Sequence, residues 1–297
     1  MELVAIDLDG TAMRAGDLIS EPVRAAIRAV QDRGVRVMLA TGRMVQSAAL
    51  YSQDLKLEPG PAICYNGAAV AELPAMHFWF RETLPDVAAR ALVTRLVADD
   101  YLVQVYVGLE IWASREDARV RRYVERNHVA AWVRGPAEIV EWPEPPIKVL
   151  VQDTSPRLAG LRRELEEEGV PGMRLVESQS DYLEVLAERT GKGRALAHVA
   201  GRLQIPRERV MAVGDGENDA DMLTFAGLGV AMGQGHPAAK AAADIIAPPV
   251  EEDGLAWALQ RLLQPSGSSV PGGARAWRGD CPRVSALVSM AWTMHGG

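Results

Sequence analysis

Short apolar runs alternate with amphipathic segments along most of this chain. Residues 3–6 are all apolar, and residues 35–39 and 210–213 are similarly rich in apolar side chains. Runs of this length are typical of strands that are buried on both faces of a parallel sheet. Ser20, followed by an apolar stripe, predicts the start of a helix over residues 23–32. The alternation predicts an α/β fold built on a doubly wound parallel sheet with right-handed crossovers.

Further elements follow from the same patterns. Asn66 and Gly67, between apolar flanks, predict a two-residue hairpin turn within residues 62–70. We expect additional helices over residues 44–51, 85–99, 117–127, 156–168, 195–203, 219–226, 236–243 and 254–263. We expect additional strands over residues 102–112, 147–152, 173–176, 182–186, 228–232 and 245–246.

The order of these elements divides the chain into three parts. Residues 84–188 contain enough helices and strands for a separate α/β domain, and the first pattern resumes after them. The sequence therefore predicts one core domain made of residues 1–83 and 189–264, with residues 84–188 inserted into it. Ser, Gly and Pro dominate the start of residues 265–297, which favours a flexible tail without a part in the chemistry.

Composition excludes several classes of protein. The chain has 297 residues, 48% hydrophobic and 24% charged, which is typical of a folded globular protein. The net charge of −7 argues against nucleic acid or an anionic membrane as the main partner. With only two cysteines, Cys64 and Cys281, we expect neither a disulfide framework nor a cysteine-rich zinc site. No apolar run reaches the ~18 residues of a membrane span. The acidic N-terminus is unlike a secretory leader, so we expect a cytoplasmic protein.

The first candidate site follows the first predicted strand. Asp7 and Asp9 come directly after residues 3–6, and Gly10 allows a sharp turn there. In a doubly wound sheet, ligands bind beyond the carboxyl ends of the strands, where these side chains are expected. Two neighbouring carboxylates repel each other unless a cation lies nearby or one is protonated. The pair suits a nucleophile beside a general acid and base, and solvated acids at a strand end would give the same pattern.

A second acidic cluster follows the strand over residues 210–213. Asp215 lies between two glycines that let the backbone approach a ligand, and Asn218 and Asp219 come shortly after it. Asp219 fits either a ligand role or the start of the next helix. Hard oxygen ligands from two strand ends, without a cluster of His or Cys, indicate Mg²⁺ rather than zinc.

Two further segments supply groups that suit an anion. Thr41, Gly42 and Arg43 follow the second strand, where a hydroxyl and free backbone N–H groups at a helix start favour an anion. Lys192 lies between two glycines just before the helix over residues 195–203, and it either binds a phosphate or is an exposed loop lysine. On this interpretation, acidic, hydroxyl and lysine groups meet at four strand ends of one sheet.

Four motifs and one shorter segment can be compared with known families. They are DLDGT at residues 7–11, ATGR at residues 40–43, Lys192, GDGENDADM at residues 214–222, and CYNGA at residues 64–68. In this order they resemble the haloacid dehalogenase (HAD) superfamily, specifically its Cof-type sugar-phosphatase branch, subfamily IIB. The resemblance covers residues 1–264 and implies a HAD-like Rossmannoid core. Residues 84–188 would then be an inserted α/β C2-type cap, which in this family covers the active site and selects the substrate.

The resemblance implies catalytic and metal-binding roles. Asp7 would attack phosphorus and form an aspartyl-phosphate. Asp9 would protonate the leaving alcohol and then activate water. Asp7, the backbone carbonyl of Asp9 and Asp215 would hold Mg²⁺, with Asp219 completing or orienting the shell. The residues that would bind the phosphate or face the pocket are Thr41, Gly42, Arg43, Asn66, Lys192 and Asn218.

These expectations define a function. We expect a Mg²⁺-dependent phosphatase, a phosphoric monoester hydrolase, that acts on a small phosphorylated metabolite such as a sugar phosphate. Phosphoryl transfer of the phosphohexomutase type, and a metabolite-binding regulator that retains the site, are the alternatives. The expected partner is the metabolite alone, without nucleic acid or membrane, and the expected assembly is a monomer or a weak homodimer.

Overall fold

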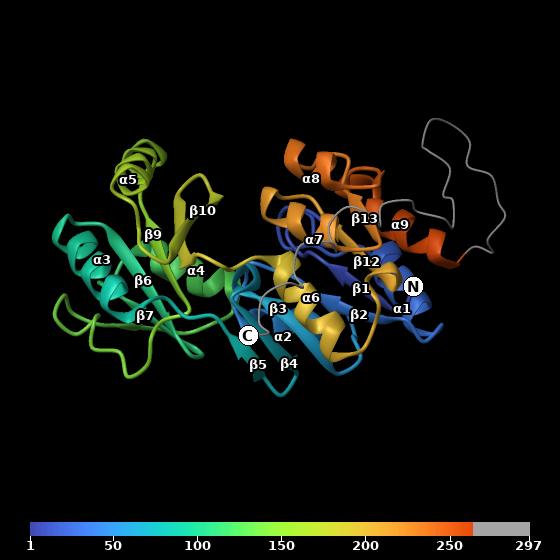
Figure 1. The fold of residues 1–297 in the computed structure, drawn as a ribbon, viewed down its shortest axis with the longest axis horizontal. Coiled ribbons are helices and arrows are strands. Elements are labelled where there is room, and N and C mark those ends of the chain that lie inside the picture. The colour runs from blue at the N-terminus through green and yellow to red at the C-terminus, as the bar shows by residue number, and fades with distance from the viewer. Residues whose placement is uncertain (264–297) are drawn as a thin grey trace, which may run out of the picture. The chain divides into compact units, whose positions relative to one another are not determined.

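The first predicted strand, β1 (Leu3–Ile6), is an interior strand of a five-stranded sheet in the computed structural model (Figure 1). The sheet has the order β14–β13–β12–β1–β2, and every neighbouring pair is parallel. Its other strands are β2 (Arg36–Leu39), β12 (Val210–Gly214), β13 (Leu228–Ala231) and β14 (Ile245–Ile246). The structure describes residues 1–263, which form one unit, and the tail predicted over residues 265–297 lies outside the described residues.

Different helices cover the two faces of this sheet, because successive side chains of a strand point to opposite sides. The covering helices are α1 (Glu21–Gln31), α6 (Lys192–Arg202), α7 (Ala220–Phe225) and α9 (Gly254–Leu263). Val4 and Ile6 of β1 share an apolar cluster with α1 and α9. Leu3 and Ala5 share another with α6 and α7. The strand is buried from both sides, and the predicted doubly wound α/β fold is confirmed.

A second sheet has six strands in the order β10–β11–β9–β6–β7–β8. Its strands are β6 (Leu102–Val107), β7 (Glu110–Ala113), β8 (Ala131–Val133), β9 (Lys148–Gln152), β10 (Met173–Gln179) and β11 (Tyr182–Ala187). We call it the inserted sheet, because all its strands lie within residues 84–188 (Figure 1). The described residues form one unit, so the division into core and cap domains stays a prediction.

The two faces of the inserted sheet differ in polarity. Val105, Val149 and Val185 point to one face, where they pack in an apolar cluster with α3 (Asp86–Ala98) and α5 (Ser155–Glu168). On the other face, Lys148 and Glu184 are buried in the company of tyrosines. Helix α4 (Ala118–Asn127) covers part of this second face. A buried polar face is unusual for a sheet, and it directs attention to what these side chains contact.

A three-stranded antiparallel sheet adjoins the five-stranded sheet through a bridge between Ala40 and Ile63. It consists of β3 (Gly60–Cys64), β4 (Ala69–Leu73) and β5 (His77–Arg81). The predicted hairpin is present, but Cys64 pairs with Ala69, so the turn contains four residues rather than two. The longer turn buries Tyr65 and Asn66 instead of leaving them at an exposed tip. Asn66 has φ 55°, a left-handed conformation that asparagine tolerates well.

The remaining predicted helices are also present. They are α2 (Val45–Asp54) and α8 (Pro237–Ala242), and His236 caps the start of α8. Strands β5 and β8 were not predicted, because their side chains are only partly buried or exposed and leave no regular apolar pattern. Within residues 1–263, no helix is long and apolar enough to cross a membrane.

Candidate active site

Lys192 forms the centre of the candidate site. Its Nζ donates hydrogen bonds to Asp7 Oδ1 and Asp219 Oδ1, each at 2.6 Å. All three side chains are almost completely buried. Asp7 follows β1 and Asp219 lies in the turn after β12, so one ammonium group links the ends of two neighbouring strands.

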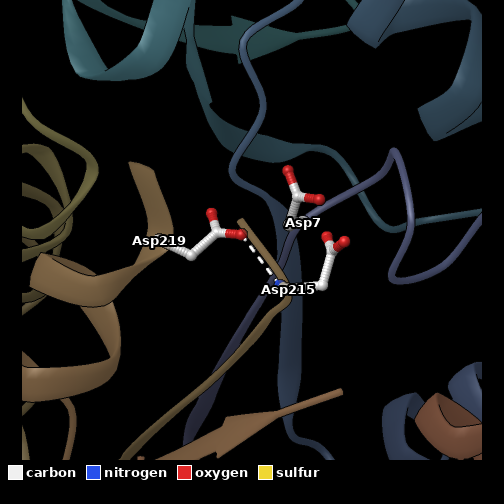
Figure 2. A group of neighbouring side chains, drawn as sticks. All are labelled: Asp7, Asp215 and Asp219. Atoms are coloured by element: carbon white, nitrogen blue, oxygen red, sulfur yellow. Dashed lines mark hydrogen bonds between the residues drawn. The ribbon is translucent and has the colours of Figure 1, made fainter. Parts of the chain in front are cut away.

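Asp215 completes the acidic group, and Figure 2 shows its carboxylate beside those of Asp7 and Asp219. Asp219 Oδ2 accepts the backbone N–H of Asp215 at 2.9 Å and that of Gly216 at 2.8 Å, which fixes the turn after β12. Thr11 Oγ1 donates to Asp215 Oδ1 at 3.1 Å. A Cβ at Gly10, where φ is 83°, would lie 2.3 Å from Asp215 Oδ2, so this position requires glycine.

Electrostatics in this cluster favour a bound cation. Burial raises the pKa of Asp7 well above its usual range, against the attraction of Lys192. Burial and the charge of Asp219 raise the pKa of Asp215 to about 6. Burial acts in the opposite direction on Lys192, but Asp219 and Asp7 still raise its pKa. The raised pKa values of Asp7 and Asp215 mean that the single positive charge of Lys192 does not fully balance the negative charge of these carboxylates.

The acidic residues fit a divalent metal ion. Asp7, Asp215 and Asp219 each offer one oxygen, and these oxygens lie within 4.8 Å of one another. Three ionised carboxylates against one ammonium leave two negative charges, which a divalent cation would balance. Carboxylate oxygens are the ligands that Mg²⁺ prefers. Both oxygens of Asp219 already accept hydrogen bonds, so Asp7 and Asp215 are the more available ligands.

Asp9 lies at the rim of the site, in an arginine clamp. Arg43 Nε and Nη2 donate to the two oxygens of Asp9 at 2.8 and 2.7 Å. The same guanidinium donates to Tyr51 and Asp17, each at 3.1 Å. Arg126, from α4, lies 3.7 Å from Asp9. Burial would raise the pKa of Asp9, but the bonds and charge of Arg43 outweigh it and hold that pKa below its usual value.

The remaining predicted phosphate-binding residues form a second side of the site. Thr41 is buried after β2, and its hydroxyl accepts the backbone N–H of Arg43 at 3.1 Å. Asn66 donates its backbone N–H to the Thr41 carbonyl at 3.1 Å. A Cβ at Gly42 would lie 2.8 Å from Asn66 Oδ1, so the two segments are in close contact. Asn218 Nδ2 donates to Asn66 Oδ1 at 2.8 Å, which joins this side to the turn that carries Asp215.

Lys192 does not come from a strand end of the five-stranded sheet, as the sequence had suggested. It is the first residue of α6, which follows β11 of the inserted sheet. The helix starts three residues earlier than predicted, so the lysine is fixed by helical backbone rather than by a loop. A Cβ at Gly193 would lie 2.5 Å from the backbone of Asp221, so glycine at this position lets α6 and α7 approach.

Several residues around the site escaped the sequence analysis. Thr11 had a signal, because it belongs to the same motif as Asp7. Tyr51, Arg126 and Glu184 had none. Tyr51 contacts Arg43 from the next helix, whereas Arg126 and Glu184 come from distant parts of the chain. Only the fold brings these side chains within reach.

Comparison with known proteins identifies the family. The sequence profile of the haloacid dehalogenase-like hydrolases matches residues 4–259. The chain belongs to the haloacid dehalogenase-like hydrolases. The family named from the motifs, with its Cof-type branch, is thereby confirmed.

Individual relatives of this hydrolase family cover nearly the whole described chain. Phosphatase YwpJ of Bacillus subtilis is 29% identical over 290 residues, covering 89% of this chain and 100% of that protein. The 5-amino-6-(5-phospho-D-ribitylamino)uracil phosphatase YcsE of the same organism is 30% identical over 272 residues, covering 89% and 96%. A crystal structure of a haloacid dehalogenase-like hydrolase from Bacteroides thetaiotaomicron has a TM-score of 0.79 at 27% identity, covering 88% and 99%. These names agree with the predicted class of phosphoric monoester hydrolase.

Proposed function

We propose that this hydrolase is a Mg²⁺-dependent phosphatase that acts on a small phosphorylated metabolite, a sugar phosphate or a similar compound. The observation that carries the proposal is the position of Lys192 Nζ, 2.6 Å from both Asp7 and Asp219. A buried ammonium beside a nucleophilic carboxylate supplies a positive charge where the phosphoryl group of a substrate would lie. The hydroxyl and backbone of Thr41 approach the same region from β2.

The reaction has two displacements at phosphorus. In the first, an oxygen of Asp7 forms a bond to phosphorus while the bond to the leaving oxygen breaks. Asp9, whose pKa Arg43 lowers and the negative charge of a bound phosphate would raise, gives that oxygen its proton. In the second, Asp9 takes a proton from water, whose oxygen attacks phosphorus and releases Asp7 and inorganic phosphate. The clamp formed by Arg43 keeps Asp9 at the rim, where leaving alcohol and incoming water would both pass.

Asp7 and Asp215, with the backbone carbonyl of Asp9, are the residues that would hold Mg²⁺. When bound, the ion would offset the repulsion between the carboxylates and a phosphate dianion. Asp219 would orient this shell, since it already fixes the backbone of the turn that carries Asp215. Lys192 then remains to neutralise the phosphoryl oxygens.

We also propose that residues 84–188 act as a C2-type cap that selects the substrate. The support is the contact of Arg126 in α4 with Asp9 at 3.7 Å, which brings the inserted segment to the rim of the site. The relative YcsE is named for 5-amino-6-(5-phospho-D-ribitylamino)uracil, so this compound belongs in a substrate panel beside hexose and pentose phosphates. We place the protein in the cytoplasm as a monomer or weak homodimer, which size-exclusion chromatography with light scattering would test.

The test uses p-nitrophenyl phosphate with purified protein. Asp7→Asn removes the nucleophile but keeps its shape, and we expect turnover to fall by at least about 10⁴-fold. Asp54→Asn, at an exposed ion pair with Arg24, is the matched control and should keep wild-type turnover. Turnover in Asp7→Asn within tenfold of wild type would refute the assignment of the nucleophile.

A further inference from the structure

A buried ion pair on the polar face of the inserted sheet has no part in the mechanism above. Lys148 Nζ donates to Glu184 Oε1 at 3.1 Å, and both side chains are almost fully buried. The same ammonium lies 4.5 Å from the centre of the Tyr106 ring. Burial opposes the charge of Lys148, yet Glu184 raises the pKa of that ammonium above its usual value, so the lysine keeps its charge. A desolvated ion pair is costly, and this one is retained on a face that turns towards the candidate site.

A continuous line of hydrogen bonds leads from this pair to the turn that carries Asp215. Asn66 Nδ2 donates to Glu184 Oε2 at 3.0 Å, across 118 residues of sequence. Asn218 Nδ2 in turn donates to Asn66 Oδ1 at 2.8 Å. We call these four residues the relay: Lys148, Glu184, Asn66 and Asn218. It joins β9 and β11 of the inserted sheet to the β3–β4 hairpin and to the turn after β12.

The chemistry of the first two members sets the direction of every bond in the relay. An ammonium group can only donate, and both carboxylate oxygens of Glu184 accept, Oε1 from Lys148 and Oε2 from Asn66. Asn66 must therefore turn its NH₂ towards Glu184, which leaves its carbonyl oxygen facing Asn218. Asn218 must then donate its own NH₂ to Asn66, so its carbonyl oxygen faces away, towards the backbone of Gly216.

We propose that Glu184 is a positioning residue that fixes the amide orientation of Asn218 in the active site. The proposal rests on the proposed function, because it gives Asn218 a role beside the metal and phosphate positions. Through the relay, contact of the inserted sheet with the hairpin decides that the Asn218 NH₂ faces Asn66 and that its carbonyl oxygen faces Gly216. The inserted segment thereby does more than enclose a substrate. It also fixes which end of the Asn218 amide donates a hydrogen bond to Asn66.

Glu184→Gln is the informative variant because it keeps the size of the side chain. Lys148 holds the new carbonyl oxygen, so the new NH₂ faces Asn66 and reverses the direction of the remaining bonds. Asn218 must then rotate its amide or lose its partner. We expect the KM for p-nitrophenyl phosphate and the inhibition constant for inorganic phosphate to rise roughly 10-fold to 100-fold. Glu110→Gln, at an exposed position of β7, is the matched control and should leave both constants unchanged.

A double variant distinguishes an effect of hydrogen-bond direction in the relay from an effect of side-chain packing. In Glu184→Gln with Asn66→Asp, the glutamine NH₂ donates to the new carboxylate, whose other oxygen accepts from Asn218 as before. Every bond is restored and the charge of the cluster is unchanged. Aspartate also tolerates the left-handed backbone at position 66. We therefore expect the double variant to recover both constants to within about threefold of wild type, a shift well below one good hydrogen bond.

The outcomes are distinct from those that test the phosphatase itself. The side-chain amide resonances of Asn66 and Asn218, followed by ¹H–¹⁵N NMR, need no turnover. Both should shift in Glu184→Gln, and that of Asn218 should return in the double variant, where residue 66 is an aspartate. Unchanged resonances in Glu184→Gln would overturn the relay, even if wild type hydrolyses p-nitrophenyl phosphate. A loss of phosphate affinity that the double variant fails to recover would also overturn it, because the effect would then be one of packing. A wild type without phosphatase activity, but with the expected shifts, would refute the proposed function and leave the relay in place.

Discussion

The two large sheets of this protein place polar groups in opposite ways. The five-stranded sheet is apolar on both faces, and its chemistry begins only beyond the strand ends, at Asp7, Thr41 and Asp215. The inserted sheet is apolar on one face and carries Lys148 and Glu184 within its strands on the other. Parallel strands covered by helices on both sides have no room for polar side chains, whereas antiparallel neighbours can keep one polar face. The first sheet therefore places its polar groups at an edge, and the second buries a few polar side chains within one of its faces.

Each sheet is associated with one buried lysine, and the two lysines have different partners. Lys192 bonds to Asp7 and Asp219, both in the candidate site. Lys148 bonds to Glu184 and lies against Tyr106. On the two proposals made above, similar burial would serve catalysis in one case and the orientation of neighbours in the other. Replacing each lysine should separate the two roles.

The largest expected difference comes from Lys192→Met compared with Lys148→Met. Removal of either charge leaves buried carboxylates without their cation, which costs about 3–5 kcal/mol of folding free energy. Turnover of p-nitrophenyl phosphate should fall roughly 10²–10³-fold in Lys192→Met only. In Lys148→Met the carboxylate of Glu184 still accepts from Asn66, so turnover should stay within about tenfold. Urea titrations and steady-state kinetics on both variants provide the test, and equal losses of turnover would contradict the comparison.

A smaller effect is expected from metal binding at the edge of the five-stranded sheet. Mg²⁺ at about 100 times its Kd should stabilise the folded protein by about 2.7 kcal/mol. This corresponds to a rise in Tm of roughly 4–5 °C at this chain length. Asp215→Asn should abolish the rise. Without Mg²⁺ this variant should melt no lower than wild type, since the raised pKa of Asp215 shows that its charge is unfavourable there.

Thermal scans with and without Mg²⁺ measure both effects, with Asp54→Asn as the control that keeps the metal response. A full Mg²⁺ response in Asp215→Asn would exclude Asp215 as a ligand. It would also mean that the metal ion does not bind at the turn after β12.

The smallest expected effects come from removing one helix cap outside the inserted segment and one within it. Ser20 caps α1 and Asp117 caps α4, and alanine at either position should cost about 1 kcal/mol. The hydrogen bond from Arg119 lowers the pKa of Asp117 to about 2. Its contribution is present above the unfolded pKa of aspartate and is lost as pH falls towards 2, so the deficit of Asp117→Ala should shrink on acidification. Urea titrations at several pH values check this, and the deficit of Ser20→Ala should show no such trend.

The core sheet and the acidic cluster could be predicted because their signals are local. An apolar run followed at once by aspartate, as at Asp7 and Asp215, shows both the strand and its reactive end. The Asn66–Gly67 signal correctly predicted a hairpin but not its four-residue turn, because burial of Tyr65 and Asn66 depends on the rest of the fold. Strand β8 was missed since two of its three residues are exposed.

The relay and the arginine clamp could not be predicted, for a different reason. Glu184 looks like an ordinary polar residue of a strand, and its partner Asn66 is 118 residues away. Arg43 looks like a phosphate ligand next to Thr41, yet its guanidinium holds Asp9 and Tyr51. In each case the sequence shows which group is available, while the choice of partner depends on which elements the fold brings together.

The tight contact between Gly10 and Asp215 has a consequence for the evolution of this protein. Any side chain at position 10 would collide with the Asp215 carboxylate, and position 193 is closed in the same way by the backbone at Asp221. Substitution of either glycine would therefore displace a neighbouring group at or near the candidate site, so sequence change at these two positions is constrained. New substrate preferences must instead accumulate elsewhere, and the inserted sheet, whose edge strand β8 is largely exposed, has the freedom to supply them.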